Sequence, residues 1–145
     1  MTFSMARGLV TQMFHHLQDA YPNEGGGFLL GTINYSTGDI AISAIQPVKN
    51  TAATEEQYHR YLMTPEDWAR LEDEADQRGL TLVGYYHSHP DSPAVPSEYD
   101  RIHALPNFRY LITSVRNGQT AELRAWQLSE DRAQFQELQL EITGE

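Results

Sequence analysis

The chain is predicted to be one α/β (α+β) domain, in which a single sheet is flanked by helices. Strand-like and helix-like segments are mixed along the sequence, without the strict strand–helix–strand alternation of a doubly wound fold. The length of 145 residues fits one domain of ordinary size. No repeat, low-complexity segment or linker divides the sequence, so residues 1–145 are predicted to form a single domain.

The first predicted element is a helix over Phe3–Ala20, because apolar residues recur there at helical spacing. This apolar stripe consists of Met5, Leu9, Met13, Leu17 and Ala20. Two strands are then predicted at Gly26–Ile33 and Ile40–Val48, and the turn-forming residues 36–39 join them as a hairpin. The polar stretch Asn50–Glu56 is predicted to be a loop.

A second helix is predicted to run to Arg78, where Gly79 ends it. Thr64 suits the N-cap of this helix, because its hydroxyl can accept from a free backbone amide, and Pro65 suits the first helical position. The β-branched and aromatic residues of Leu80–His87 predict a strand. Prolines at positions 90, 93 and 96 then predict a stiff loop without regular structure.

The remaining sequence predicts a short helix followed by strands. The helix is expected over Ser97–Ala104 and closes before Pro106. Three more strands are predicted at Phe108–Val115, Thr120–Ser129 and Gln134–Thr143. Asn117 and Gly118 favour a tight hairpin turn between the first two of these strands.

The composition excludes several classes of protein. Ten basic and twenty acidic residues give a net charge of −10, which disfavours binding to nucleic-acid backbones. The chain has no cysteine, so thiolate zinc fingers, iron–sulfur clusters and cysteine nucleophiles are excluded. No stretch reaches the roughly 20 apolar residues of a membrane span. The first ten residues lack the layout of a secretory signal, so a cytoplasmic protein without membrane contact is expected.

Two histidines at the end of a predicted strand are the strongest chemical signal. Side chains alternate along a strand, so His87 and His89 project to the same side, where they can share one metal ion. Asp100 follows at the start of a helix, and two histidines with one carboxylate form a known catalytic zinc set. A non-haem iron site stays chemically possible, as do two strand histidines bonded only to backbone. Neither H-E-x-x-H nor P-C-x-x-C occurs, which excludes two other zinc-enzyme classes.

Two further residues are candidates for catalysis. A zinc hydrolase needs a base that takes a proton from water, and Glu24 is the candidate, at a helix-to-strand junction beside three glycines. Ser97 has two open interpretations, because its hydroxyl suits either the N-cap of the Asp100 helix or the oxyanion of a tetrahedral intermediate.

Most of the chain resembles the JAMM (MPN-plus) metalloprotease family, whose pattern is a glutamate, a distant H-x-H-P and S-x-x-D. The matching segments are Tyr21-Pro22-Asn23-Glu24 through Gly31, His87-Ser88-His89-Pro90, Ser97 and Asp100. The resemblance implies a curved, mostly antiparallel or mixed sheet of cytidine-deaminase-like architecture. It also implies zinc (Zn²⁺) on His87, His89 and Asp100, acid and base catalysis by Glu24, and oxyanion support by Ser97.

The resemblance further implies cleavage next to the C-terminal tail of a ubiquitin-like protein. Many bacterial members carry a cysteine shortly after the glutamate, where this chain has Gly26 and Gly27. The chain also lacks room for the insertions by which eukaryotic deubiquitinases of the family grip a second ubiquitin. It is therefore similar to the minimal prokaryotic members, which are associated with sulfur-carrier proteins.

The predicted function is zinc-dependent cleavage of the amide bond after a Gly-Gly tail of a ubiquitin-like or sulfur-carrier protein. The alternative is a catalytically silent MPN-type scaffold that binds a protein partner, and the complete ligand set argues against it. A DNA-repair-associated relative is disfavoured by the acidic charge. Tyr58, Arg60 and Tyr61 are candidates for lining a groove for the tail. The sequence leaves the oligomeric state open.

Overall fold

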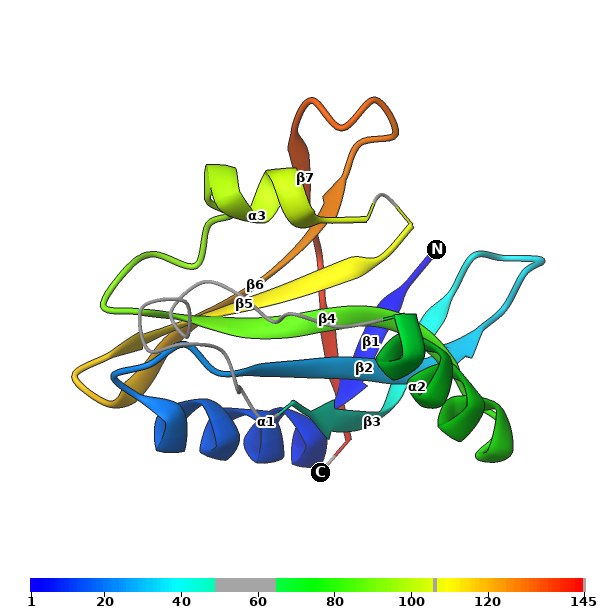
Figure 1. Cartoon of the computed structure of the whole chain (residues 1–145), viewed down its shortest axis with the longest axis horizontal. Helices are drawn as coiled ribbons and strands as arrows, with labels where there is room; N and C mark the ends of the chain where they lie inside the picture. Colours follow the sequence, from blue (N-terminus) through cyan, green and yellow to red (C-terminus); the bar gives the residue numbers. More distant parts are fainter. Residues whose placement is uncertain (49–64, 106, 145) are drawn as a thin grey trace.

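The computed structural model describes residues 1–48, 65–105 and 107–144, and eight strands in this part of the chain form one sheet. The sheet order is β7-β6-β5-β4-β2-β3-β1-β8. The strands are β1 (Phe3–Ala6), β2 (Gly26–Ile33), β3 (Ile40–Pro47), β4 (Thr81–Pro90), β5 (Arg109–Arg116), β6 (Gln119–Leu128), β7 (Phe135–Leu138) and β8 (Glu141–Thr143). The helices are α1 (Arg7–Ala20), α2 (Pro65–Gln77) and α3 (Glu98–His103), arranged as Figure 1 shows.

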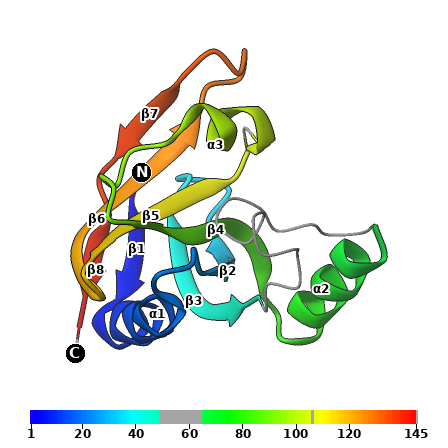
Figure 2. The same ribbon diagram turned by 60° about the vertical axis from the view of Figure 1, so that its left-hand side comes forward.

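The sheet is mixed and curled, which confirms the predicted fold class. β1 pairs in parallel with β3 and β8, and β4 pairs in parallel with β5, while the other neighbours are antiparallel. The two edge strands, β7 and β8, are joined by only Gln139 and Leu140. Figure 2 shows that the sheet curls until these edges approach each other, so that it forms a half-barrel.

The prediction of a helix over the whole of Phe3–Ala20 is wrong for its first four residues. Phe3 and Met5 are buried while Ser4 and Ala6 are more exposed, which is the period of a strand. The backbone of these residues pairs with β3, opposite residues 40–42. This pairing over a long sequence separation overrides the local helical spacing, and α1 therefore begins at Arg7.

The single strand predicted at Gln134–Thr143 is also wrong, because this segment forms two strands at opposite edges of the sheet. β7 pairs with β6, whereas β8 pairs with β1. The short break between them lets the chain pass from one edge to the other. Sheet curvature depends on all eight strands together, so local periodicity does not reveal it.

The strand predicted at Gly26–Ile33 has these bounds in the structure, and the other predicted elements are present with shifted ends. β4 extends beyond the predicted strand, to Pro90, so both candidate histidines lie within it. Asn117 and Gly118 have φ values of 52° and 81°, as the predicted hairpin turn requires. Gly79 has φ 70° and follows α2, as predicted for a helix end. Thr64 and the loop Asn50–Glu56 lie outside the described residues.

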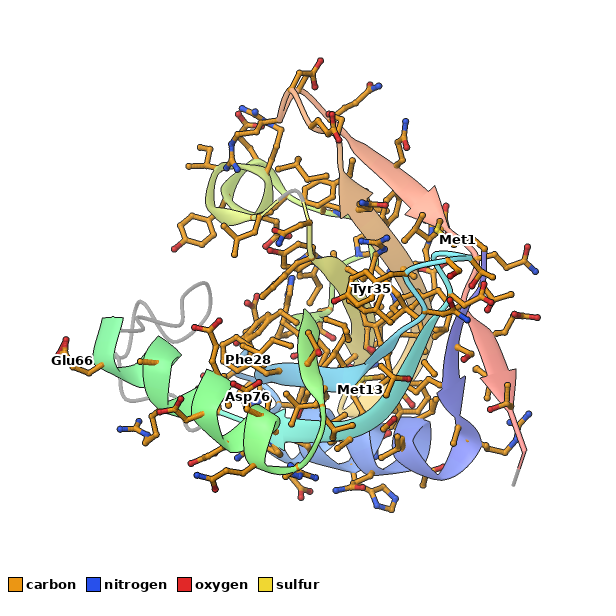
Figure 3. All side chains as sticks on the ribbon, turned by 90° about the vertical axis from the view of Figure 1, so that its right-hand side faces the viewer. Met1, Met13, Phe28, Tyr35, Glu66 and Asp76 are labelled. Carbon is orange, nitrogen blue, oxygen red and sulfur yellow. The ribbon has the colours of Figure 1, made fainter. Side chains whose placement is uncertain are left out.

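The helices α1 and α2 cover different parts of the sheet, and each packs against a separate apolar cluster. Met13 and Leu17 of α1 are fully buried against one face, in the largest apolar cluster. α2 contacts β4 and packs through Ala75 against Leu30. In Figure 3, Met13 marks the side covered by α1, and Glu66 marks the first turn of α2. None of the described helices has the length and apolar character that crossing a membrane would require.

Candidate functional site

The two histidines of β4 lie side by side on one face of the sheet. Their ring centroids are 5.1 Å apart, as expected for residues two positions apart on a strand. His87 is 5% exposed and lies opposite Gly26 of β2 and Ile112 of β5. β4 is an interior strand of the sheet, so its neighbours fix the backbone that carries both imidazoles.

Asp100 reaches both histidines from α3. One carboxylate oxygen lies 3.6 Å from His87 Nε2, and the other lies 3.1 Å from His89 Nε2. The helix is positioned by a capping box, in which the Ser97 amide donates to the Asp100 carboxylate at 2.8 Å. The Asp100 amide donates in return to the Ser97 hydroxyl at 3.1 Å. Ser97 is therefore an N-cap, and its hydroxyl still has a proton to donate toward the site.

A backbone carbonyl orients the second histidine. His89 Nδ1 lies 2.9 Å from the Pro93 carbonyl oxygen, which accepts only a protonated nitrogen. This hydrogen bond directs Nε2 toward Asp100 and makes it the nitrogen available to a metal ion. In metal sites a ligating histidine commonly donates its other ring N–H to a backbone carbonyl in this way.

Glu24 approaches the histidines from the segment between α1 and β2. Its side chain is 9% exposed, and Oε1 lies 3.6 Å from His87 Nδ1. The next residue, Gly25, is fixed to β4, because its amide donates to the buried Ser88 hydroxyl at 2.9 Å and its carbonyl accepts from the Ser88 amide. Gly25 also packs closely on α1, where an added Cβ would lie 2.9 Å from that of Ala20. Both contacts determine where Glu24 points.

A second link between segments lies at the edge of the site. The Tyr21 hydroxyl donates to the Asp91 carboxylate at 2.6 Å. The Asn117 amide donates to the other oxygen of Asp91 at 2.9 Å. The segment that carries Glu24, the end of β4 and the β5–β6 turn therefore meet at Asp91. No local sequence pattern indicates this contact, because the residues are far apart along the chain.

The two carboxyl groups of the site have opposite electrostatic environments. Burial raises the pKa of Glu24 to about 9, and the charge of Asp100 adds to this rise. Burial would also raise the pKa of Asp100, but the two histidines and the Ser97 amide hold it below its usual value. Burial lowers the pKa of His87, whereas hydrogen bonds to Asp100 and Pro93 outweigh burial and raise the pKa of His89.

The donor atoms fit a metal ion. The acceptor and imidazole atoms of Glu24, His87 and His89 lie within 4.8 Å of one another and form a buried His-His-Glu group. Asp100 lies beside it, 3.1 to 3.6 Å from the imidazole nitrogens. Two ligands of one tetrahedral zinc ion are about 3.4 Å apart, given bonds of about 2.1 Å. His87 Nδ1 is buried without a hydrogen bond, and Glu24 Oε1 lies 3.6 Å from it.

A cavity of about 460 Å³ opens onto this group. It is lined by Pro22, Glu24, His89, Pro90, Asp91, Ser92, Pro93, Val95, Ser97, Tyr99 and Asp100. Its walls come from the segment after α1, the end of β4, the proline-rich loop and α3. A substrate group in this cavity would lie beside both carboxylates, the Ser97 hydroxyl and the His89 imidazole.

The structure thus brings together all five residues that the sequence singled out: Glu24, Ser97, His87, His89 and Asp100. It adds Ser88 and the Pro93 carbonyl, whose parts in the site depend on contacts that no sequence pattern indicates. Tyr58, Arg60 and Tyr61 lie outside the described residues.

Comparisons with known proteins agree with this geometry. Residues 6–129 match the family of prokaryotic homologues of the JAB domain. The chain is 38% identical to a desampylase of Haloferax volcanii over 101 residues, which cover 69% of this chain and 68% of that protein. It is 31% identical over 106 residues to a probable TtuB-protein conjugate cleaving protease of Thermus thermophilus, covering 73% of this chain and 66% of that protein.

A solved structure shows the same fold. The crystal structure of a JAB1/MPN domain protein from Archaeoglobus fulgidus superposes with a TM-score of 0.57 at 16% sequence identity, and the match covers 99% of this chain and 98% of that one. The family match, the curled mixed sheet and the buried His-His-Glu group all lead to one assignment. The chain belongs to the prokaryotic JAB/MPN (JAMM) domain family and is a metallopeptidase of the JAMM type.

Proposed function

We propose that this protein is a zinc-dependent (iso)peptidase, which hydrolyses the amide bond after the C-terminal Gly-Gly tail of a ubiquitin-like or sulfur-carrier protein. The main support is that Glu24, His89 and Asp100 line one cavity. His87 lies behind them, with its two ring nitrogens 3.6 Å from Glu24 and from Asp100. Two relatives are named for the cleavage of protein conjugates, a desampylase and a probable TtuB-conjugate cleaving protease. We further propose that the protein acts in the cytoplasm.

In this proposal His87, His89 and Asp100 would hold a zinc ion, which when bound would lower the pKa of a water molecule to about 7 and polarise the substrate carbonyl. Glu24 takes the proton from the attacking water and delivers it to the departing amine. Burial favours the protonated carboxyl that the second step needs. The positive charge of a bound zinc ion would favour the carboxylate that the first step needs. The Ser97 hydroxyl donates to the oxyanion while its oxygen continues to cap α3.

The substrate tail is proposed to enter the cavity in an extended conformation. Gly-Gly residues have no side chains, so their backbone can approach the residues that line the cavity. Backbone hydrogen bonds along a strand edge would then supply affinity without demanding a particular sequence.

The test combines zinc content with cleavage. Purified wild type and Asp100→Ala are dialysed identically against a mild chelator, and the zinc per chain is measured. Both are then incubated with a ubiquitin-like protein fused through Gly-Gly to a reporter, and with a matched fusion through Ala-Ala. We expect about one zinc per wild-type chain, loss of zinc in Asp100→Ala, and cleavage only by wild type and only after Gly-Gly.

Two other outcomes would contradict the proposal. Absence of zinc from the wild type would remove the metal chemistry. Zinc binding with stable capture of the ubiquitin-like protein, but without cleavage of either fusion, would favour the scaffold function instead.

A further inference from the structure

The proline-rich loop between β4 and α3 is fastened to the sheet at four successive residues. Its first residue, Asp91, donates its amide to the Val115 carbonyl at 2.8 Å. The Ser92 carbonyl accepts from the Ser114 hydroxyl at 2.6 Å. The Pro93 carbonyl lies 2.9 Å from His89 Nδ1. The metal-site contact is therefore one of a series, and the sheet supplies the others.

The fourth fastening is the Trp126 side chain. Its Nε1–H donates to the Ala94 carbonyl at 3.1 Å in a buried hydrogen bond. Ala94 is fully buried and packs with Ile112 and Trp126 in a small apolar cluster. The guanidinium of Arg124 lies 4.9 Å from the centre of the Trp126 ring. The tryptophan is thus held in place itself and provides both an apolar surface and a directed donor to the loop.

These contacts lie on the face of the sheet that carries the site. Ser114 of β5 pairs with His89 of β4. Trp126 pairs with Tyr110 of β5 and lies on β6, two strands away from His89. Figure 1 shows the loop turning back at the end of β4 to enter α3. On this path its carbonyls reach Ser114 of β5 and Trp126 of β6. The loop therefore spans the surface between the histidines and Trp126.

We infer that Trp126 and Ser114 are positioning residues of the metal site. They fix the carbonyls on either side of Pro93, so that the Pro93 carbonyl stays in line with His89 Nδ1 and holds His89 Nε2 toward the ion. This inference rests on the metal-binding part of the proposed function. Both residues act through the loop, because their side chains donate to the Ser92 and Ala94 carbonyls. Such outer partners commonly change metal affinity about 10- to 100-fold when they are altered.

A purely structural explanation makes a different prediction. Trp126 also contributes apolar surface to the cluster with Ala94, and any truncation there would lower stability. The substitution Trp126→Phe keeps an aromatic ring and removes the donor. Tyr110→Phe is the matched control, because Tyr110 packs against the same cluster and accepts from the Leu105 amide at 2.7 Å, away from Pro93. Both variants lose one hydrogen bond, but only the first loses one on the loop.

The experiment measures two properties of wild type, Trp126→Phe and Tyr110→Phe. The first is the zinc dissociation constant, by competition with a chromophoric chelator. The second is the ¹⁵N NMR signal of His89, which reports whether Nδ1 carries a slowly exchanging proton, in metal-free and zinc-loaded protein. We expect Trp126→Phe to weaken zinc binding about tenfold and to speed exchange of the Nδ1 proton, and Tyr110→Phe to change neither.

The outcomes separate this inference from the proposed function. Unchanged zinc affinity and Nδ1 exchange in Trp126→Phe would overturn the inference, as would equal losses in both variants. If wild type bound no zinc, the proposed function would fail, and the Nδ1 signal of the metal-free protein would still decide on the loop. Ser114→Ala provides a second variant should Trp126→Phe not fold, with the same expected changes in affinity and exchange.

Discussion

The two walls of the site hold their carboxylates in different ways. Glu24 lies in a buried wall, where its segment is fixed to β4 through the fully buried Ser88 and packed on α1 through Gly25. Asp100 lies in a more open wall, where α3 and the proline-rich loop are held by capping and by contacts to the sheet. The first wall buries its carboxyl group more deeply, and the second supplies hydrogen bonds from Ser97 and His89 to the Asp100 carboxylate.

This difference separates the roles of two chemically similar groups. The buried wall raises the pKa of Glu24 to about 9, so a proton on Glu24 is stabilised. The polar wall lowers the pKa of Asp100, so its charge is retained for a cation. Carboxyl groups pushed in opposite directions mark an acid–base partner and a fixed anion, as in other hydrolases. The environment of each group, rather than its residue type, makes the distinction.

The strongest way to break this comparison is to neutralise each carboxyl group separately. We expect Glu24→Gln to retain zinc and to lose about 10²- to 10⁴-fold in cleavage rate, since it removes the acid–base group. We expect Asp100→Asn to lose zinc after dialysis and to lose activity as a consequence. Zinc content and the rate with a Gly-Gly fusion are measured for both variants.

Exposed acids provide the controls for these two substitutions. Glu72 and Asp73 are exposed residues of α2 and do not line the cavity. Glu72→Gln and Asp73→Asn should therefore leave the zinc content and the cleavage rate unchanged. If Glu24→Gln lost zinc while Asp100→Asn kept it, the roles assigned to the two walls would be exchanged. This outcome would agree with the His-His-Glu group acting as the ligand set.

The sequence predicted the inner part of this site better than its supports. Strand alternation alone places His87 and His89 on one side of the sheet. Asp100 lies in the first turn of a short helix, close enough to contact both histidines. The supports depend on contacts between residues far apart in the sequence. Ser88 and Gly25 are 63 positions apart, and Trp126 and Ala94 are 32 apart. Such contacts arise only from the folded sheet, so no local pattern predicts them.

The errors in the predicted fold have the same physical origin. Phe3–Ala6 was predicted as helix because local spacing permits a helix, but backbone pairing with β3 decides its structure. The break between β7 and β8 reflects the curl of the whole sheet, since those strands belong to opposite edges. The elements near the site were easier to predict from the sequence, because His87 and His89 lie on an interior strand and α3 begins at a strong capping sequence.

The dependence of stability on pH distinguishes the two walls, because the pKa values of Glu24 and Asp100 are shifted in opposite directions. The unfolded chain releases the Glu24 proton near pH 4.5, whereas the folded, metal-free protein keeps it up to about pH 9. Between these values the folded state binds more protons, so its stability must fall as pH rises. The slope attributable to Glu24 is at most about 1.4 kcal/mol per pH unit. The Asp100 contribution has the opposite sign and is lost only as the pH falls below the ordinary Asp value of 3.8.

The measurement is the free energy of unfolding in urea for metal-free wild type and Glu24→Gln between pH 7 and 9. We expect the wild type to lose stability across this range and Glu24→Gln to lose less. The difference between the two proteins removes the contribution of His89, whose raised pKa adds a slope of the same sign. Parallel curves would show that Glu24 is already ionised in the folded protein at pH 7.

The smallest expected effect compares the serines that support the two walls. Ser88→Ala would leave the buried Gly25 amide without its acceptor, at a cost of about 1–3 kcal/mol. Ser97→Ala would remove the N-cap of α3, where solvent can reach the freed amide, at a cost of about 1 kcal/mol. Urea unfolding of both metal-free variants at pH 7 measures the difference. If Ser97→Ala proved the more destabilising, water would not be replacing the hydrogen bond that the Ser97 hydroxyl accepts from the Asp100 amide. The wall formed by α3, rather than the Glu24 segment, would then be the more rigid one. A greater loss in Ser88→Ala, with a fall in cleavage rate at unchanged zinc content, would instead establish that burial on this side fixes the proton-carrying group in place.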